Sequence, residues 1–112
     1  MKVVTAVIKP YTWEPTRSAL ERVGVTGLTV CEVSGAGRQK GHEEVYRGAE
    51  YDAALVPKIR IEVVVEDSEV AGVVAAVLDS AGTGRIGGGK VWVVPVDAVV
   101  RVRTGDLDGA VP

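Results

Sequence analysis

The amino-acid sequence predicts an α+β fold whose elements follow one another in the order βαββαβ. Three observations support this prediction: short runs rich in β-branched residues, two stretches with apolar residues at helical spacing, and glycines or prolines at the boundaries between them. The chain has 112 residues, and 46% of them are hydrophobic. A chain of this length and composition is expected to form one domain around one core.

The first half of the chain predicts a strand, a helix and a second strand. β-branched residues dominate residues 2–9, and Pro10 lacks the backbone donor that would continue this strand. Pro15 lies near the first turn of the helix that follows, and Gly24 suits its left-handed C-terminal cap. The apolar face of this helix comprises Ala19, Leu20 and Val23. Residues 28–33 then form the second strand, which glycines interrupt shortly afterwards.

The second half predicts a third strand, a second helix and a final strand region. The apolar residues Ile59, Ile61, Val63 and Val65 recur at every second position, as on one buried face of a strand. Ser68 offers an N-cap for the second helix, and Gly82 ends it. The apolar side of this helix comprises Val70, Val74, Val77 and Leu78. Residues 91–94 and 98–102 flank Pro95, so they form either one strand bent at a bulge or two short strands.

This order of elements is that of a ferredoxin-like split βαβ sandwich, in which both helices cover the same face of an antiparallel sheet. The other face then has no helix to cover it. Val64 and Val99 are out of phase with the core positions, so part of that face is apolar. Exposed apolar patches favour association, and we therefore expect the chain to self-associate.

Charge and composition argue against several classes of protein. Thirteen Lys and Arg residues against 15 Asp and Glu residues give a formal net charge of −2, so nucleic acid is not an expected partner. The longest apolar stretches, such as residues 91–96, are far shorter than the roughly 20 residues that cross a bilayer. The chain opens without a signal-peptide pattern and has one cysteine, so we expect a cytoplasmic protein. That cysteine, Cys31, is expected to be a small buried hydrophobe.

Between the second and third strands, residues 37–57 show no clean helical or strand period. Structureless connections of this length are uncommon unless they are functional or disordered. The segment is rich in charged side chains and carries Tyr46 and Tyr51, unlike an inert Gly/Ser spacer. We therefore expect this segment to carry the function of the protein. The alternative is that it is only a mobile loop in solvent.

Residues 84–90, Gly-Arg-Ile-Gly-Gly-Gly-Lys, satisfy the first part of a P-loop pattern. Val91 stands where that pattern needs Ser or Thr, and the segment leads from a helix into a strand rather than the reverse. Both features argue against a P-loop NTPase. Successive glycines still allow backbone amides to approach phosphate oxygens, and Lys90 adds a positive charge beside them. The alternative is an ordinary glycine-rich turn.

Arg101 and Arg103 are two residues apart in the last expected strand, so they project from the same face about 7 Å apart. Val100 and Val102 then point to the core. Paired guanidinium groups suit a polyphosphate, and together with Lys90 they can hold an anion such as ATP. The alternative is a solvated strand face.

Catalytic arrangements are scarce in this sequence. His42 is the only histidine, and no closely spaced carboxylates or histidine pair predict a metal cage or a catalytic triad. We therefore predict no catalytic residues.

Two motifs resemble the signatures of the PII nitrogen-signalling family. Residues 46–51, Tyr-Arg-Gly-Ala-Glu-Tyr, resemble the signature in the T-loop of that family, and residues 83–92 resemble the signature in its B-loop. Shorter matches occur in the same order along the chain, at residues 8–10, 23–27, 35–42, 57–58 and 100–105. The resemblance therefore covers nearly the whole chain.

The resemblance implies one PII-like domain over residues 1–112, with the T-loop at about 37–57, the B-loop at 82–90 and a C-terminal loop at 102–112. It also implies a homotrimer that binds ATP or ADP, Mg²⁺ and 2-oxoglutarate in clefts between subunits. Such a protein is a cytoplasmic sensor of nitrogen, carbon and energy state that acts through its T-loop and is not an enzyme. The alternatives are a slow nucleotide hydrolase that uses the same cleft and a trimeric adaptor that does not depend on nucleotides.

The residues that match the binding positions of the family are Thr29, Gly37, Arg38, Gln39, Lys58, Val64, Gly87, Gly88, Gly89, Lys90, Arg101 and Arg103. By this resemblance, Thr29 and Val64 lie near the nucleoside, and most of the others contact the phosphates. Gln39 would ligate Mg²⁺ together with the ATP phosphates and 2-oxoglutarate, and Lys58 would pair with a carboxylate of 2-oxoglutarate. Gly88 replaces the Asp that is usual in the family, which removes a carboxylate beside the phosphates.

The resemblance also implies partners. Tyr51 would accept a uridylyl or adenylyl group from a nucleotidyltransferase, and Ala49 stands where some members carry a phosphorylatable serine. The implied targets are ammonium transporters and the regulators and enzymes of glutamine synthesis and nitrogen assimilation. A transporter partner would recruit the protein to the membrane.

Overall fold

The computed structural model describes residues 1–36, 55–82, 84 and 88–107. The strands are β1 (Lys2–Ile8), β2 (Thr29–Gly35), β3 (Val56–Val65) and β4 (Gly89–Pro95), and the helices are α1 (Trp13–Arg22) and α2 (Val70–Ala81). A 3₁₀ turn precedes each helix, at Pro10–Thr12 and at Asp67–Glu69. The predicted order βαββαβ and the α+β, ferredoxin-like fold are confirmed. Neither of the helices described is long and apolar enough to cross a membrane.

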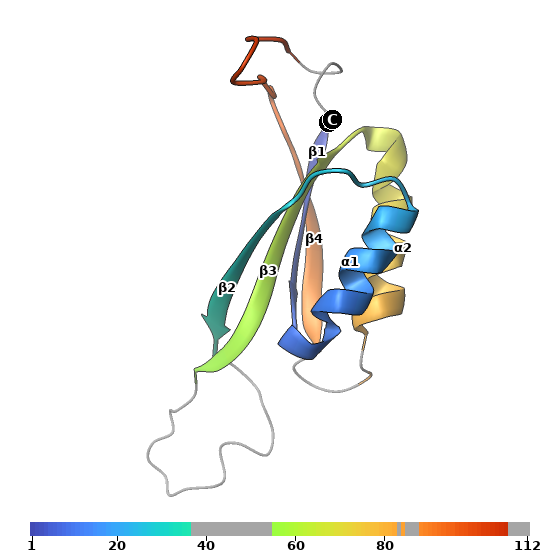
Figure 1. Ribbon diagram of the computed structural model, residues 1–112, viewed down its shortest axis with the longest axis vertical. Helices are drawn as coiled ribbons and strands as arrows, with labels where there is room; N and C mark the ends of the chain where they lie inside the picture. The colour runs from blue at the N-terminus through green and yellow to red at the C-terminus, as the bar shows by residue number, and fades with distance from the viewer. Residues whose placement is uncertain (37–54, 83, 85–87, 108–112) are drawn as a thin grey trace, which may run out of the picture.

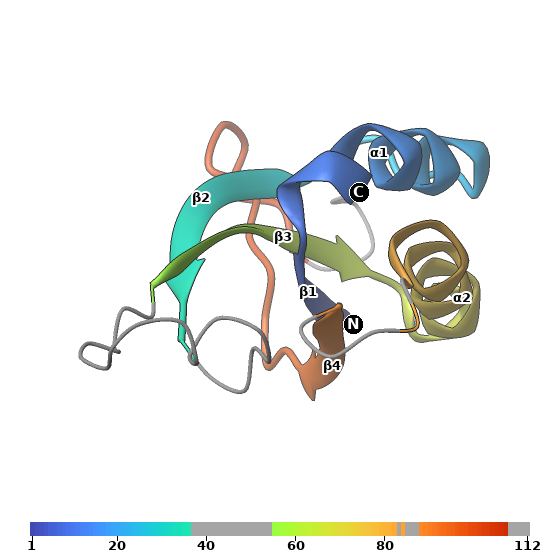
Figure 2. The ribbon, with the colours of Figure 1, turned by 90° about the horizontal axis from the view of Figure 1, so that it is seen from below.

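The four strands form one antiparallel sheet in the order β2-β3-β1-β4. Ile8 of β1 faces Ile59 on one side and Gly89 on the other, at the end of the sheet where β2 leaves and β3 enters. We call this the loop end. The opposite end, where Lys2 faces Val65, is called the far end. Both helices pack against one face of the sheet and leave the other face uncovered (Figure 1, Figure 2).

The hydrophobic core lies between the helices and the sheet. Its buried members are Val4, Ala6, Ile8, Ala19, Leu20, Ile61, Val63, Val65, Val73, Ala76, Val77 and Ala81. The predicted alternation along β3 is confirmed, because Ile61, Val63 and Val65 are buried on the helical side and Ile59 packs partly buried against the same core. Leu20 is 0% exposed. Truncating such a side chain to alanine typically costs about 2 to 5 kcal/mol of stability.

The N-terminus of α2 differs from the prediction, because Ser68 is not its cap. The chain turns earlier, in the 3₁₀ segment Asp67–Glu69, and Glu66 and Glu69 form a capping box around it. The Glu69 carboxylate accepts a hydrogen bond from the Glu66 backbone N–H at 2.9 Å. Acidic side chains here satisfy unpaired N–H groups and interact favourably with the helix dipole. The predicted apolar side of α2 is also wrong at one position, because Leu78 is 58% exposed.

The segment after β4 departs furthest from the prediction. β4 ends at Pro95, and residues 98–102 form neither a bent continuation of it nor a second strand. The Val96 N–H donates a hydrogen bond to the Met1 carbonyl at 3.1 Å, next to the start of β1 at Lys2. Beyond this point, the described part of the chain offers residues 98–102 no strand to pair with. Backbone groups need partners, so the chain turns back on itself instead.

This turn joins Val100 to Leu107 by a single β-bridge. The Arg101 N–H donates a hydrogen bond to the Asp106 carbonyl at 2.9 Å and helps to close the turn. Val100 is 51% exposed and Val102 is 98% exposed. The prediction that both valines point to the core is therefore wrong.

The uncovered face of the sheet is largely apolar at its edges and polar at its centre. It carries Val3, Thr5 and Val7 of β1, Thr29, Cys31 and Val33 of β2, Lys58, Arg60, Glu62 and Val64 of β3, and Lys90, Trp92 and Val94 of β4. Trp92 is 39% exposed and Val94 is 46% exposed. Val64 lies on this face, out of phase with the core, as predicted. Cys31 is exposed on the edge strand β2, so the prediction that it is buried is wrong.

Candidate functional site

The candidate binding residues fall into two groups at the two ends of the sheet. Lys58, Gly88, Gly89 and Lys90 lie at the loop end, whereas Val64, Arg101 and Arg103 lie toward the far end. Thr29 faces Glu62, near the middle of the sheet. Lys90 faces Val7 near the loop end, and β4 reaches Pro95 at the far end before the chain continues to Arg101. Five residue steps separate Lys90 from Pro95, which is about 17 Å along a strand.

At the loop end, Lys58 is buried although its side chain carries a charge. The residue is 7% exposed, and Gly35 on the neighbouring strand leaves room for it, since a Cβ at Gly35 would lie 3.3 Å from Lys58 Cγ. Burial lowers the pKa of Lys58, and the positive charge of Lys9 lowers it further. Two neighbouring ammonium groups attract an anion, so this corner of the sheet suits a carboxylate or a phosphate.

Gly89 allows the chain to enter β4 close against β1. Its φ is +123°, and a Cβ at this position would overlap the carbonyl oxygen of Val7. Only glycine fits here without strain. The exposed Lys90 follows directly on the uncovered face. An exposed lysine at this position is suited to a phosphate oxygen.

Toward the far end, Val64 lines a small pocket between β3, the start of α2 and the segment that follows α1. Gly24, with a φ of +97°, turns this segment and confirms the predicted end of α1. Val23, predicted on the apolar face of α1, is 45% exposed beside the pocket. The pocket volume is about 70 Å³. Typical ligand pockets have roughly 300 to 1,000 Å³, so this one can hold only part of a nucleotide.

Arg101 and Arg103 lie beyond β4, in the turn above the far end of the sheet (Figure 1). Arg101 is half-buried, and Arg103 is exposed. Because this segment is a turn and not a strand, the predicted parallel projection of the two side chains does not apply. The structure also does not bring them to Lys90 of the same chain, because the length of β4 lies between them.

Sequence reasoning missed a polar cluster at the centre of the uncovered face. Arg60 Nη2 lies 2.9 Å from Glu62 Oε2, and the guanidinium carbon of Arg60 lies 5.9 Å from the centroid of the Trp92 ring. The period of two in β3 places Arg60 and Glu62 on one face and could have predicted the first contact. Nothing in the sequence predicts the second contact, because β1 separates β3 from β4.

The remaining candidate residues cannot be placed relative to this geometry. Gly37, Arg38, Gln39, Tyr51 and Gly87 lie outside the described residues. Within the described ranges, no group of three His, Cys, Asp or Glu residues is placed to hold a metal ion. The predicted Mg²⁺ ligand, Gln39, and the predicted modification site, Tyr51, therefore stay predictions.

Comparisons with known proteins agree with the resemblance found in the sequence. A family model described as "Nitrogen regulatory protein P-II" matches residues 1–106. The nitrogen regulatory protein P-II of Azospirillum brasilense is 52% identical over 109 residues, which cover 97% of each chain. In Escherichia coli (strain K12), the nitrogen regulatory protein GlnK is 49% identical and the nitrogen regulatory protein P-II 1 is 51% identical, each over 110 residues and 98% of both chains. These matches and the ferredoxin-like fold show that the chain belongs to the P-II family of nitrogen regulatory proteins.

Proposed function

We propose that this protein is a cytoplasmic sensor that binds ATP or ADP and 2-oxoglutarate and regulates proteins of nitrogen assimilation through residues 37–57. A nitrogen-regulatory signalling role follows from its membership of the P-II family. The relatives compared are named as regulatory proteins. The proposal therefore gives this protein residues that bind effectors and no catalytic residue.

The separation of the two groups of candidate residues is the observation that carries the proposal. Gly89 and Lys90 at the loop end cannot reach the same phosphates as Arg101 and Arg103 of the same chain, because they lie at opposite ends of β4. A complete site therefore needs the loop end of one copy beside the far end of another. The proposed assembly is the homotrimer that the family resemblance implies, with one such cleft between each pair of neighbours.

Exposed apolar side chains support self-association. Trp92 and Val94 are 39% and 46% exposed on the uncovered face. In the turn beyond β4, Val102 and Leu107 are 98% and 58% exposed. Removing apolar surface from water contributes roughly 25 cal/mol per Å², so docking a second copy on these side chains is favourable.

In the proposed cleft, two copies share the nucleotide. The phosphates lie against the backbone around Gly89 and the ammonium group of Lys90 in one copy. The guanidinium groups of Arg101 and Arg103 approach the same phosphates from the next copy, as charge-assisted donors. Thr29 and Val64 of that second copy contact the nucleoside. Val64 also lines the small pocket toward the far end of the sheet in that copy.

2-Oxoglutarate is proposed to bind at the loop end of the same cleft. Lys58, with Lys9 beside it, presents positive charge to a carboxylate. Gln39 would hold Mg²⁺, which when bound coordinates oxygens of the phosphates and of 2-oxoglutarate. Gly37, Arg38, Gly87 and Gly88 would complete the contacts around the phosphates. On this proposal, 2-oxoglutarate binds only when Mg²⁺ and ATP are present, and ADP does not substitute.

The proposed output is contact between the T-loop and target proteins. The proposed targets are ammonium transporters, one of which would recruit the protein to the membrane, and the regulators and enzymes of glutamine synthesis. A nucleotidyltransferase acting on Tyr51 would control these contacts covalently. Nucleic acid is not among the proposed partners, because the formal net charge is −2.

Mixed assemblies test the shared cleft. Lys90→Ala disables the loop end and Arg103→Ala disables the far end, so each variant alone should bind ATP weakly in isothermal titration calorimetry. Co-expression of the two variants should restore a fraction of tight sites. The intact cleft in such a mixture joins the loop end of an Arg103→Ala copy to the far end of a Lys90→Ala copy. A site built within one chain would recover no tight binding.

Two further measurements separate the alternatives. Sustained release of phosphate from ATP above the rate of a Lys90→Ala control would indicate the slow nucleotide hydrolase. Target binding that does not respond to ATP, ADP or 2-oxoglutarate would indicate the nucleotide-independent adaptor. The proposed sensor requires target binding that changes with these ligands and no turnover above the control.

A further inference from the structure

Helix α2 is unusually apolar for a helix at the surface. Asp79 is the only charged residue among its 12 residues. Its exposed residues are Ala71, Gly72, Ala75, Leu78 and Asp79, and Leu78 is 58% exposed. A surface helix normally carries polar and charged residues on its outer side, and a helix that is apolar all round is normally buried. The outer side of α2 therefore has the composition of a covered surface.

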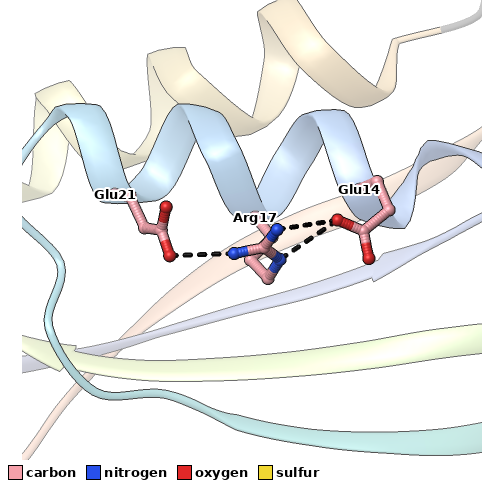
Figure 3. A network of polar contacts seen from close by, with 3 residues as sticks. All are labelled: Glu14, Arg17 and Glu21. Atoms are coloured by element: carbon pink, nitrogen blue, oxygen red, sulfur yellow. Dashed lines mark hydrogen bonds and ion pairs between the residues drawn. The ribbon is translucent and has the colours of Figure 1, made fainter.

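The neighbouring helix α1 shows the ordinary pattern. Arg17 forms ion pairs with Glu14 at 2.8 Å and with Glu21 at 2.9 Å along its exposed side (Figure 3). The charged side chains of Glu14, Arg17 and Glu21 thus pair with one another within α1. The outer side of α1 is therefore adapted to water, and the contrast with α2 is a property of this sequence and not of the helical layer as a whole.

A shallow groove of about 410 Å³ lies between the two helices. It is lined by Ala19, Arg22, Val23, Gly72, Ala75, Ala76, Asp79 and Ser80. Arg22 and Asp79 are the only charged residues in this lining, and they have opposite signs. Within the described part of the chain, neither of them forms an ion pair.

The two charges lie at opposite ends of the groove because the helices are antiparallel. Ser80, near the C-terminus of α2, is hydrogen-bonded through Oγ to Thr16 Oγ1, near the N-terminus of α1, at 2.9 Å. Arg22 is the last residue of α1, so it lies beside the first turns of α2, near Gly72. Gly72 and Asp79 are seven positions apart, which is about 10 Å along a helix.

We propose that this groove binds the same groove of a second copy of the chain around a two-fold axis. A two-fold contact presents one surface to itself, so opposite charges at the two ends of a groove meet their counterparts in the other copy. Arg22 then pairs with Asp79 of the partner subunit at both ends of the contact. Gly72 and Ala75, the small exposed residues of α2 in the groove lining, pack between these pairs. Charge complementarity within one groove is what identifies a second copy as the occupant.

This surface lies on the helical side of the sheet, opposite the uncovered face (Figure 2). The pairing is therefore independent of the proposed nucleotide cleft. Where the uncovered face assembles as proposed, pairing through the helices would join one assembly to another, and the paired fraction would rise with protein concentration.

Sedimentation velocity over a range of protein concentrations tests the pairing. The wild-type protein should show a reversible rise in mass above that of its smallest assembly, and Ala75→Lys, which places a long charged side chain in the groove, should abolish the rise. Arg22→Asp and Asp79→Arg each turn both ion pairs of the contact into repulsions, so each should weaken the association at least tenfold. The double variant restores both pairs with reversed polarity and should return to within about twofold of the wild type.

Glu21→Arg is the matched control for Asp79→Arg. It changes the net charge by the same amount on α1 but lies outside the lining of the groove, so the concentration-dependent rise should persist. Circular dichroism of every variant checks that the helices are intact. A wild-type mass that does not rise with concentration, or a double variant no better than the single ones, would overturn the proposal. The mass of the smallest assembly reports separately on the uncovered face, so either assembly can fail without the other.

Discussion

The guanidinium group of Arg60 lies 5.9 Å from the centroid of the Trp92 ring, although Arg60 belongs to β3, Trp92 belongs to β4, and β1 lies between these strands. The same guanidinium group pairs with Glu62 at 2.9 Å. Thr5 of β1 faces both Glu62 and Trp92 and is only 2% exposed. These side chains therefore form an ordered cluster across three strands at the centre of the uncovered face.

A double-mutant cycle on this pair measures the contact. We expect Arg60→Ala and Trp92→Ala to be non-additive, with a coupling free energy of about 0.5 to 1 kcal/mol, which is typical of an exposed cation–π pair. Urea unfolding of the two single variants and the double variant gives this value. Trp92→Phe, which retains an aromatic face, should keep part of the coupling. Fully additive effects would mean that the cation–π geometry adds nothing to stability.

Loss of Arg103 should weaken ATP binding without affecting the fold. One charge-assisted contact is worth about 1.5 to 3 kcal/mol, so Arg103→Ala should reduce the affinity for ATP roughly 10- to 150-fold in isothermal titration calorimetry. Arg22→Ala serves as the control, because Arg22 lies in the helical layer, away from both groups of candidate residues. An unchanged affinity in Arg103→Ala would remove Arg103 from the site.

Lys58 should titrate below the ordinary lysine pKa of 10.5, because burial and the charge of Lys9 both disfavour its ammonium form. An NMR titration of the ¹³Cε resonance of Lys58 measures this directly. Lys9→Ala removes one of the two causes, so it should raise the pKa of Lys58 back toward 10.5. A midpoint for Lys58 at or above 10.5 in the wild-type protein would contradict the burial argument.

The same shift has a defined effect on stability. Between the lowered pKa of Lys58 in the folded protein and its ordinary value of 10.5 in the unfolded chain, the unfolded chain binds more protons. The contribution of Lys58 to the free energy of unfolding therefore rises with pH in this interval. Below the interval Lys58 is charged in both states, and there its burial lowers the free energy of unfolding by the full amount. Lys58→Met should remove this contribution, which chemical unfolding at several pH values would show.

Replacement of Gly89 should be more damaging than replacement of another glycine with positive φ. A Cβ at Gly89 meets the Val7 carbonyl oxygen, whereas a Cβ at Gly24 has nothing within 4 Å. Gly24→Ala should therefore cost only the strain of a left-handed backbone, about 1 to 2 kcal/mol. Gly89→Ala adds a steric overlap and should cost clearly more in thermal or urea unfolding. Equal losses would show that β4 can shift away from β1.

Tyr51 should be the covalent switch of the T-loop. A nucleotidyl group on its hydroxyl adds a bulky phosphodiester with one negative charge, which should block entry of the loop into a partner by size and by the cost of desolvation. Intact-mass spectrometry of protein from nitrogen-starved and ammonium-fed cells should show a nucleotidyl mass shift in one condition. The shift should disappear in Tyr51→Phe and persist in Tyr46→Phe. Unmodified protein in both conditions would mean that the protein signals through ligand occupancy alone.

The order of the elements, most of the core and the family could all be predicted from the amino-acid sequence. The alternation in residues 59–65 predicts β3 and its buried side, and Pro10 and Gly24 mark the ends of β1 and α1 as the structure has them. These features depend on residues a few positions apart, whose periodicity and backbone preferences act locally. The motifs at residues 46–51 and 83–92 identified the family for a similar reason, because each is a continuous stretch of chain.

Which candidate residues lie together depends on how the strands pair, and this could not be predicted from the sequence. Lys90 and Arg101 are close in sequence, but β4 carries the chain along the whole sheet between them, so they belong to opposite ends of it. Val100 and Val102 are β-branched like strand residues and still belong to no strand, because β1 pairs with β4 only as far as Pro95 and no other strand among the described residues lies beside them. Strand pairing needs a neighbour contributed by a distant part of the chain, and no local pattern records whether that neighbour is present.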